Sequence, residues 1–473
     1  MPSSAAGPTD AGPRQFAVFL SSQYPGSRYE TEPLSGGLVN ITARARLCEP
    51  SSSSNNASSE DGQQQPPPAS LVLKYAPPFI AAVGSSAPFS QGRQAIEART
   101  LRLFSPDGPL AALNVKGGEG VTVPRLVAHD TARWVLAMED LGALVTLWDV
   151  FFFSRTNSSG SSVFAEGAEF CAEMGRRLGA FMAAVHSPVS LNAVLSSGTA
   201  AEAAAAEAAD DAAAIVYSAA VEPVLARLQE QGGLSPTTAS RLFERVHNDA
   251  VRTRPYAGEA CLAMGDFHPG SVLVSRPLTT DPAADSAAAV PVVVAAIDWE
   301  FAVAGDGGRG VNGDMAQFLA SLFALVVSLR PRWAGDGGGV RQLREAVGEF
   351  VRQLCRTYAA RSAVVARVAA AVVERRAGDG QGVRLAVAED GAMAIFRSAL
   401  ILFGRETVNQ AVDLKWDISN GPSESLVAEM VAAGAWYLER AGDSVEEMLQ
   451  DENWDKLMHE DMGFMLQLFG IET

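Results

Sequence analysis

Two short apolar stretches, each joined to a turn that carries carboxylates, constrain this chain most. The first, "LAMGDFHPGSVLV" (residues 262–274), places Asp266 and His268 in a turn of Gly and Pro directly before a β-branched strand. The second, "VVVAAIDWEFA" (residues 292–302), ends an apolar strand with Asp298 and Glu300. Residues two apart on an extended chain project to the same side. The fold must therefore hold these carboxylates on rigid scaffold that borders a cleft.

These carboxylates suit two kinds of chemistry. Asp266 is typical of a general base, or of a group that orients a hydroxyl nucleophile. Asp298 and Glu300 together offer the oxygens that a hard divalent cation prefers. Taken alone, an aspartate after a strand is as readily a cap or a turn residue. The occurrence of both motifs in one chain favours the catalytic interpretation.

Composition excludes several classes of partner and site. The chain has 473 residues, of which 48% are hydrophobic and 19% charged, enough for a sizeable core in two or three units. Its 37 Lys and Arg against 54 Asp and Glu give a net charge of −17, so we expect no nucleic-acid partner. The 4 cysteines lie far apart without a CxxC pair, which indicates reduced intracellular thiols rather than a zinc site or a disulfide framework.

The sequence gives no sign of a membrane segment or of a secretion signal. The N-terminus has no apolar stretch of signal-peptide length. The longest apolar run, residues 315–329, is shorter than the roughly 20 residues that span a bilayer, so we interpret it as a buried helix. We therefore expect a soluble cytoplasmic protein with no membrane partner.

The order of the sequence patterns predicts an α+β fold. Strand patterns at 40–47 and 70–76 and a helical segment at 89–104 occupy the first third, and helical patterns dominate from about residue 146. We predict a small β-rich lobe over residues 1–138 and a larger, mainly helical lobe over 139–473, with the ligand site between them. A polar, low-complexity stretch at about 49–69 is predicted to be a disordered loop of the first lobe.

Both motifs resemble those of the aminoglycoside phosphotransferase and choline kinase family, and in detail those of methylthioribose kinases. The family's catalytic loop reads His-Gly-Asp-x-His-x-x-Asn, or ends in Gly-Ser in methylthioribose kinases; residues 264–271 of this chain read Met-Gly-Asp-Phe-His-Pro-Gly-Ser. Residues 298–302, Asp-Trp-Glu-Phe-Ala, are similar to Asp-Pro-Glu-Phe-Ala of methylthioribose kinases. The resemblance implies a protein-kinase-like two-lobe fold and ATP-dependent transfer of a phosphoryl group to a hydroxyl.

The resemblance also implies roles for residues of the first third. Lys74 would contact the phosphates of ATP, and Glu97 on the following helix would pair with Lys74 to hold it. The turn with Gly36 and Gly37 would cover the phosphates, because glycines let backbone amides approach closely. Residues 135–142 resemble the segment that joins the lobes, and the residues expected at adenine are Met138, Glu139 and Leu141.

The same resemblance places the chemistry on the two motifs, although the loop departs from the family pattern. Asp266 would accept the proton of the acceptor hydroxyl, and Mg²⁺ would be held by Asp298, Glu300 and Ser271. Met264 replaces the family's first histidine, and Ser271 replaces the usual asparagine, as it does in methylthioribose kinases. We expect His268 to brace the loop by hydrogen bonds. The other histidines lie in no motif and are interpreted as surface or packing residues: His129, His186, His247 and His459.

Arg397 is the candidate residue on the acceptor side. It lies in the apolar helical stretch "AMAIFRSALILFGRETV" (residues 392–408), where an unpaired guanidinium would be costly. One explanation is a buried ion pair with a neighbouring helix. The other comes from the resemblance, because methylthioribose kinases carry two adjacent arginines in a similar segment near the substrate, and only the first is matched in this chain. That difference favours an acceptor with fewer anionic or electron-rich groups than methylthioribose.

Three functional hypotheses follow. The leading one is an ATP- and Mg²⁺-dependent phosphotransferase that acts on a hydroxyl of a small molecule such as a sugar, an aminoglycoside or an amino alcohol. The alternative is a catalytically weak, nucleotide-binding scaffold of the same fold, which Met264, Ser271 and the long insertions support. A protein kinase is third, because the chain lacks a His-Arg-Asp loop and an Ala-Pro-Glu segment. The sequence alone leaves the acceptor and the oligomeric state open.

Overall fold

The structure, a computed structural model, describes most of the chain. The described residues are 11–34, 37–50, 66–116, 119–153, 167–197, 214–275, 292–335, 337–377, 391–414, 416, 423–448, 450–459 and 463–471. Gly36 and residues 51–65 of the loop expected to be disordered lie outside these ranges.

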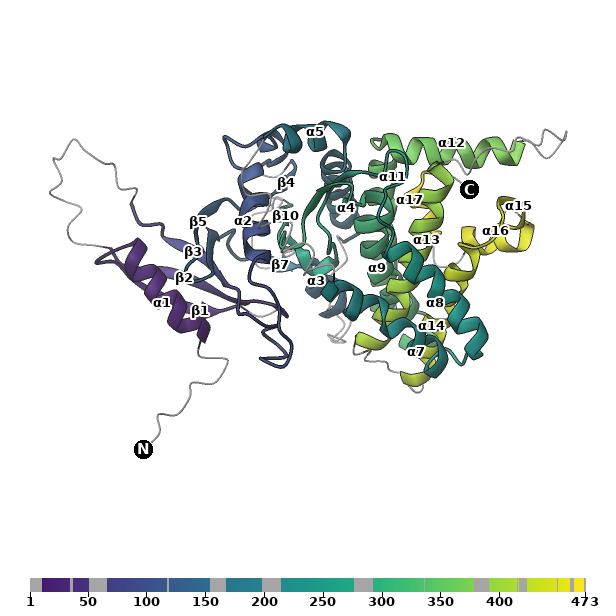
Figure 1. Cartoon of the computed structure of the whole chain (residues 1–473), viewed down its shortest axis with the longest axis horizontal. Helices are drawn as coiled ribbons and strands as arrows, with labels where there is room; N and C mark the ends of the chain where they lie inside the picture. The colour runs from purple at the N-terminus through teal and green to yellow at the C-terminus, as the bar shows by residue number, and fades with distance from the viewer. Residues whose placement is uncertain are drawn as a thin grey trace.

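A five-stranded antiparallel sheet forms the N-terminal part of the molecule (Figure 1). Its spatial order is β1-β2-β3-β6-β5, with β1 (Arg28–Pro33), β2 (Ile41–Glu49), β3 (Ser70–Tyr75), β5 (Leu126–Asp130) and β6 (Val135–Glu139). Two of these strands, β2 and β3, match the strands predicted at 40–47 and 70–76. The predicted helix at 89–104 is α2 (Arg93–Leu103), one turn shorter at its start.

Alternation along the strands gives the sheet two different faces. Leu71 and Leu73 of β3 point to one side, where they pack with Phe16 and Phe19 of α1 (Ala11–Gln23). The apolar spacing Phe16, Phe19 and Leu20 puts three side chains on one helical stripe, which is why α1 covers this face. The opposite face of the sheet carries Lys74, which contacts Glu97 on α2. A short helical turn, η3 (Ala111–Leu113), follows α2.

Short strands surround the two sequence motifs. The strands β9 (Val272–Val274) and β10 (Val294–Ala296), each of which adjoins one of the motifs, pair antiparallel. A second sheet adds β4 (Val121–Thr122), which runs parallel to β10, and β7 (Val145–Thr146), which pairs with β9. A two-stranded ribbon joins β8 (Cys261–Ala263) to β11 (Val303–Gly305), so the segment before the catalytic loop lies beside the segment after Glu300.

Helices make up most of the remaining chain (Figure 1). Those before the catalytic loop are α3 (Leu147–Phe153), α4 (Gly167–Val185), α5 (Pro188–Ser196), the π-helical turn η4 (Tyr217–Val221), α7 (Pro223–Glu230) and α8 (Pro236–Ala250). Those within and after it are the turns η5 (Pro269–Ser271) and η6 (Gly310–Met315), then α9 (Ala316–Ser328), α10 (Pro331–Ala334), α11 (Gly338–Ala359), α12 (Ala363–Ala377), α13 (Gly391–Asp413), α14 (Ser423–Arg440), α15 (Val445–Met448), α16 (Asp451–His459) and α17 (Phe464–Leu468). The predicted α+β, two-lobe architecture is confirmed.

Two glycines of α4 let this helix approach α11 closely. A Cβ added at Gly175 of α4 would lie 2.2 Å from the carbonyl oxygen of Phe350 in α11, and one at Gly179 would lie 2.3 Å from that of Leu354. The backbones of α4 and α11 are therefore in direct contact.

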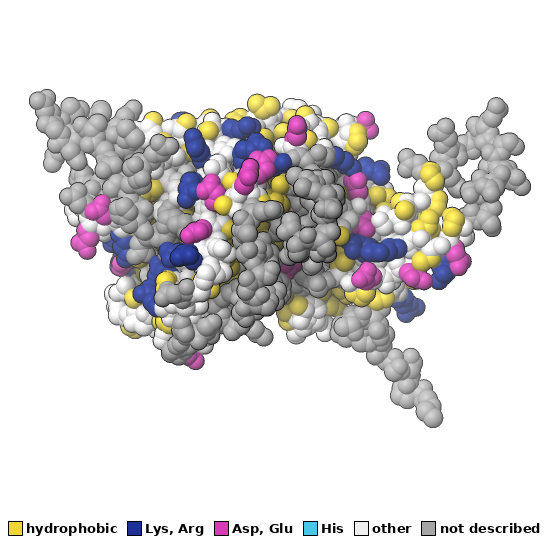
Figure 2. All heavy atoms as spheres, turned by 180° about the vertical axis from the view of Figure 1, so that it is seen from behind, with side chains coloured by type: hydrophobic (Ala, Val, Ile, Leu, Met, Phe, Trp, Pro, Cys, Tyr) yellow, Lys and Arg dark blue, Asp and Glu magenta, His cyan; other side chains and the backbone are white. Residues whose placement is uncertain are grey.

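The apolar helix around α9 is buried in the core. Residues Gly310–Ser328 are long and apolar enough to cross a membrane by length and composition, but 89% of that window is buried inside the structure. This agrees with the interpretation of residues 315–329 as a buried helix. On the face shown in Figure 2, basic and acidic side chains lie interspersed among the described residues.

Candidate active site

Lys74 lies at the centre of an ion-pair cluster that joins three separate segments. Its Nζ lies 2.7 Å from Oε2 of Glu97 on α2 and 2.5 Å from Oδ1 of Asp298 after β10. Lys74 and Glu97 are buried, whereas the Asp298 side chain keeps 36% of its surface exposed. The pairing of Lys74 with Glu97 is the one that the sequence resemblance implies.

Burial and mutual charge control the ionisation of this cluster. Burial alone would lower the pKa of Lys74, but the carboxylates of Asp298, Glu300 and Glu97 outweigh it and raise that pKa. Burial would likewise raise the pKa of Asp298, and the nearby Lys74 ammonium lowers it below its usual value. The site therefore favours a charged lysine beside a charged Asp298.

Glu300 contacts two buried polar residues of the N-terminal part. Its Oε2 accepts a hydrogen bond from Nδ2 of Asn40 at 2.8 Å and lies 3.3 Å from Nε of Arg93. Arg93 is fully buried and also donates to Oδ1 of Asn40 at 3.1 Å. Burial raises the pKa of Glu300 to about 7, and the neighbouring Asp298 carboxylate adds to the shift. Glu300 thus connects the glycine turn, through Asn40, with α2 and with the segment after β10.

The catalytic-loop motif forms a closed turn with its own residues. His268 Nδ1 accepts a hydrogen bond from the backbone N–H of Gly270 at 3.0 Å, which is the bracing role predicted for it. The hydroxyl of Ser271 donates to the carbonyl of His268 at 2.6 Å and accepts from the backbone N–H of His268 at 3.2 Å. Ser271 is fully buried, and both of these hydrogen bonds of its hydroxyl lie within the loop.

The two motifs lie side by side. The backbone N–H of Ile297 donates to the carbonyl of Ser271 at 2.9 Å. Gly265 has a φ of 83°, and a Cβ there would lie 2.2 Å from the carbonyl oxygen of Phe301, so this position requires glycine. The carboxylate of Asp266 follows directly, and its Oδ1 accepts a hydrogen bond from Nε2 of Gln317 on α9 at 2.5 Å.

Asp314 and His186 support the loop at residues 264–271 from its buried side. Neither residue was identified as functional from the sequence. The buried carboxylate of Asp314 accepts hydrogen bonds from the backbone N–H groups of Met264 at 2.7 Å and Gly265 at 3.0 Å. His186, interpreted from the sequence as a surface or packing residue, lies 3.0 Å from Asp314 through Nε2. No local signal marks His186, because it follows an ordinary amphipathic helix. Asp314 directly precedes the apolar run at 315–329, and no motif in the sequence assigns it a role.

The segment expected at adenine is the end of β6 and the turn after it. Met138 is buried and pairs with Val72 across the sheet, Glu139 accepts from Lys116 Nζ at 2.5 Å, and Leu141 is half-buried. Arg44 of β2 holds the following turn through Asp140, at 2.8 Å. Gly37, the described glycine of the turn expected to cover the phosphates, lies where a Cβ would be 2.7 Å from the carbonyl oxygen of Asn40.

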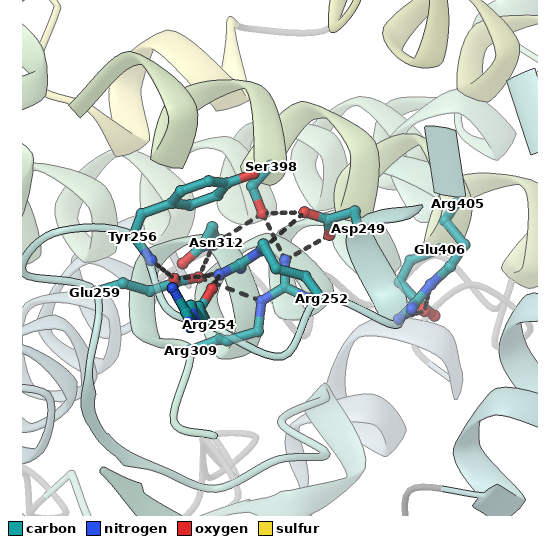
Figure 3. Close-up of polar contacts among 10 residues, drawn as sticks. All are labelled: Asp249, Arg252, Arg254, Tyr256, Glu259, Arg309, Asn312, Ser398, Arg405 and Glu406. Carbon is teal, nitrogen blue, oxygen red and sulfur yellow. Dashed lines mark hydrogen bonds and ion pairs between the residues drawn. The ribbon is translucent and has the colours of Figure 1, made fainter. Parts of the chain in front are cut away.

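Arg397 lies in the first half of α13. Its Nη2 donates to the carbonyl of Asp443 at 2.9 Å, a contact with the turn after α14. The next residue, Ser398, belongs to a buried polar network shown in Figure 3. In that network Ser398 donates to Asp249 at 2.7 Å and accepts from Asn312 at 2.9 Å, while Arg309 bonds Asp249 at 2.5 Å. The network fixes the segment that leads into Asp314.

Comparison with known proteins finds structural likeness only. No protein-family model and no curated protein matches the chain. The GDP and kanamycin complex of APH(2")-IIia is 12% identical, with a TM-score of 0.37, covering 90% of this chain and 97% of that one. Choline kinase from Cryptosporidium parvum is 10% identical, with a TM-score of 0.33 and coverages of 97% and 99%. Spectinomycin phosphotransferase APH(9)-Ia, in complex with ADP and spectinomycin, is 10% identical, with a TM-score of 0.30 and coverages of 83% and 98%.

These proteins come from the group of phosphotransferases and kinases that the two sequence motifs resemble.

Proposed function

We propose that this chain is an ATP-dependent phosphotransferase that phosphorylates a hydroxyl of a small molecule. The observation that carries the proposal is the joining of three distant segments at Lys74, which contacts Glu97 and Asp298 beside the loop that carries Asp266. Phosphoryl transfer needs positive charge at the phosphates, a metal-binding carboxylate and a carboxylate at the nucleophile. Lys74 is suited to meet the phosphates, Asp298 to bind the metal and Asp266 to contact the nucleophile.

The donor set supports a magnesium nucleotide, with Asp298 as its main protein ligand. Carboxylate oxygens of Glu97, Asp298 and Glu300 lie within 4.8 Å of one another. All three carboxylates have partners: Glu97 and Asp298 pair with Lys74, and Glu300 pairs with Asn40 and Arg93. Asp298 is nevertheless best placed to reach a bound ion, because its side chain is partly exposed whereas those of Glu97 and Glu300 are buried. Mg²⁺ prefers oxygen ligands and commonly takes several from water and phosphate, which suits a single partly exposed carboxylate. Ser271 and Glu300 remain proposed ligands of lower rank, because both are buried.

Asp266 acts on the acceptor. A substrate hydroxyl that lies against its Oδ2 would be oriented for attack on the γ-phosphorus of ATP. Its proton would pass to the carboxylate as the new phosphoester bond forms and the bond from the γ-phosphorus to the β–γ bridging oxygen breaks, releasing ADP. Gln317 holds the other oxygen at 2.5 Å, which fixes the plane of the carboxylate. The electrostatic part of catalysis comes from Lys74, whose charge the surrounding carboxylates favour.

The test compares the chain with its Asp266→Asn variant. Magnesium-dependent transfer from ATP is measured against a panel of sugars, aminoglycosides, choline and amino alcohols, together with nucleotide binding by calorimetry. We expect turnover with at least one acceptor, a loss of about a hundredfold or more in Asp266→Asn, and nucleotide affinity within about twofold of the unchanged chain. Binding of ATP without turnover by the unchanged chain would favour the scaffold alternative, and near-normal turnover in Asp266→Asn would remove its assigned role.

A further inference from the structure

Arg44 of β2 fastens the N-terminal sheet to the turn after β6. Its Nη2 donates to the carbonyl of Gly142 at 2.7 Å and to Oδ1 of Asp140 at 3.1 Å, and its Nε lies 2.8 Å from Oδ2 of Asp140. Only 17% of the Arg44 side chain and 7% of the Asp140 side chain are exposed. A guanidinium that meets both oxygens of a carboxylate fixes the orientation of that carboxylate as well as its position.

The register of the sheet places Arg44 on the face that carries Lys74. Residues directly opposite each other in antiparallel strands point to the same face. Thr42 lies opposite Lys74, and two positions further along β2 Arg44 lies opposite Val72, which in turn lies opposite Met138 of β6. Arg44, Val72 and Met138 therefore form one row across the sheet, next to the row of Lys74. This row leads to the segment expected at adenine.

The segment at residues 139–142 is held at both of its ends. The backbone N–H of Glu139 donates to the carbonyl of Arg125 at 2.9 Å, and that of Gly142 donates to Oδ1 of Asp140 at 3.0 Å. Among the residues that the structure describes, none accepts a hydrogen bond from the N–H of Leu141, which lies between them. A backbone N–H without a protein partner needs water or a ligand. A ring nitrogen of a purine is an acceptor of the required kind.

We propose that Arg44 is a positioning residue for the base of the nucleotide, because it fixes the turn that presents the Leu141 N–H. The effect on nucleotide affinity rests on the proposed function, whereas the effect on the order of the segment does not. A segment that is ordered before binding loses less conformational freedom when the ligand binds. A residue that merely stabilised the fold would change the melting temperature without changing nucleotide affinity, and one that merely added charge would act on the phosphates.

Two substitutions of Arg44 and one matched control separate these possibilities. Arg44→Gln removes the charge and the paired contacts with Asp140. Arg44→Lys keeps a positive charge beside Asp140, but its single nitrogen cannot meet both carboxylate oxygens and the Gly142 carbonyl together. The control is Arg46→Gln, because Arg46 lies two positions further along the same face of β2, has 62% of its side chain exposed and pairs with Glu32 at 3.9 Å.

The first readout is the affinity for adenosine, which has no phosphates, and for ATP with Mg²⁺, both measured by calorimetry. We expect Arg44→Gln to weaken the binding of both ligands by about tenfold, and Arg44→Lys to weaken it by less. Arg46→Gln should stay within about twofold of the unchanged chain, because exposed ion pairs contribute little. In turnover assays Arg44→Gln should raise the KM for ATP by the same factor, with kcat within about twofold.

Two outcomes of the affinity measurements would overturn the positioning role. Weaker binding of ATP with unchanged binding of adenosine would mean that Arg44 acts on the phosphates through its charge. Equal losses in Arg44→Gln and Arg46→Gln would mean that any positive charge on this face of the sheet has the same effect. A lower melting temperature of Arg44→Gln with unchanged affinity for both ligands would leave Arg44 a structural residue and likewise overturn the proposal.

The second readout needs no nucleotide and therefore distinguishes a failed inference from a failed function. Hydrogen exchange followed by mass spectrometry should be faster across residues 139–142 in Arg44→Gln than in the unchanged chain and in Arg46→Gln. If the unchanged chain binds neither adenosine nor ATP, the proposed function fails, and this comparison still decides whether Arg44 orders the segment. Unchanged exchange across the segment in Arg44→Gln would overturn the inference.

Discussion

Asp298 has a backbone conformation that few residues with a side chain adopt. Its φ is 68°, and among the described residues that are not glycine only Trp134 shares a positive φ. A residue held in this region costs of the order of 1 kcal/mol or more, and such residues gather at functional sites. In this chain the conformation lets the carboxylate face Lys74 while the next residue, Trp299, is fully buried. The outlier therefore supports a functional role for Asp298 more than for Glu300, which lies in the interior.

His129 gives a prediction about acid sensitivity at the scale of one residue. Burial lowers its pKa to about 4, and the positive charge of Arg102 adds to the effect. The unfolded chain, with a histidine pKa near 6.5, binds this proton more readily than the folded chain. The free energy of unfolding should therefore fall as the pH is lowered from about 6.5 to about 4, with a slope of at most about 1.4 kcal/mol per pH unit from this group.

Replacing His129 with glutamine removes the titrating group and should flatten this part of the stability curve. Urea titrations at a series of pH values measure the slope in the unchanged chain and in His129→Gln. The exposed substitution Lys116→Gln is a control for the change of a single basic residue on this part of the molecule. An identical slope in the unchanged chain and in His129→Gln would show that His129 does not titrate in this range.

Glu300 links three elements, and its removal should be felt as a loss of stability. The side chains of Asn40 and Arg93 both contact it, and Arg93 has no exposed surface. Breaking a buried ion pair by removing one partner typically costs about 3 kcal/mol or more, because the remaining charge stays buried. We expect Glu300→Ala to lower the free energy of unfolding by about this amount and Asp298→Ala by less, since the Asp298 side chain is partly exposed.

Chemical denaturation of the two alanine variants, with and without Mg²⁺, tests this order. In the presence of nucleotide, Asp298→Ala should raise the magnesium requirement for turnover more than Glu300→Ala does. A stable Glu300→Ala variant with a strongly raised magnesium requirement would instead make Glu300 a primary ligand and place it ahead of Asp298.

The contact between α4 and α11 supplies the last prediction at the scale of elements. A Cβ at Gly179 would lie 2.3 Å from the carbonyl oxygen of Leu354, which is backbone and cannot turn aside. We expect Gly179→Ala to push the helices apart and to lower stability by about 2 kcal/mol. The control is Gly339→Ala at the start of α11, where an added Cβ meets nothing within 4 Å and alanine should raise stability by about 0.5 kcal/mol. Thermal unfolding of both variants measures the difference, and equal effects would contradict the close approach.

Sequence patterns predict the parts of this molecule that depend on local order. Short stretches of sequence are enough to predict the strand that carries Lys74, the helix that carries Glu97 and the apolar strands beside the two motifs. The contacts missed from the sequence join residues far apart in the chain. His186 and Asp314 are separated by 128 residues, and Asn40 and Glu300 by 260. No local period or motif encodes such pairs, because they arise only when helices and lobes pack.

At the scale of the whole molecule, aromatic packing connects the N-terminal part with the helical part. The buried ring of Trp299 lies 5.1 Å from Phe104, directly after α2, and 6.4 Å from Phe181 on α4. Trp299 lies between Asp298 and Glu300 in the chain. This one segment therefore contacts Lys74 through Asp298, the aromatic core through Trp299 and Arg93 through Glu300.

This connection predicts that a magnesium nucleotide stabilises the folded chain as a whole. A ligand that binds only the folded state adds about 2.7 kcal/mol at a hundred times its Kd, so ATP with Mg²⁺ should raise the melting temperature in one cooperative transition. Lys74→Met should abolish most of this rise, because it removes the charge proposed to meet the phosphates. Lys456→Met, at a lysine that lies 4.6 Å from the Trp436 ring on the helical part, should retain the rise. A full nucleotide-dependent rise in Lys74→Met would place the phosphates elsewhere in the molecule.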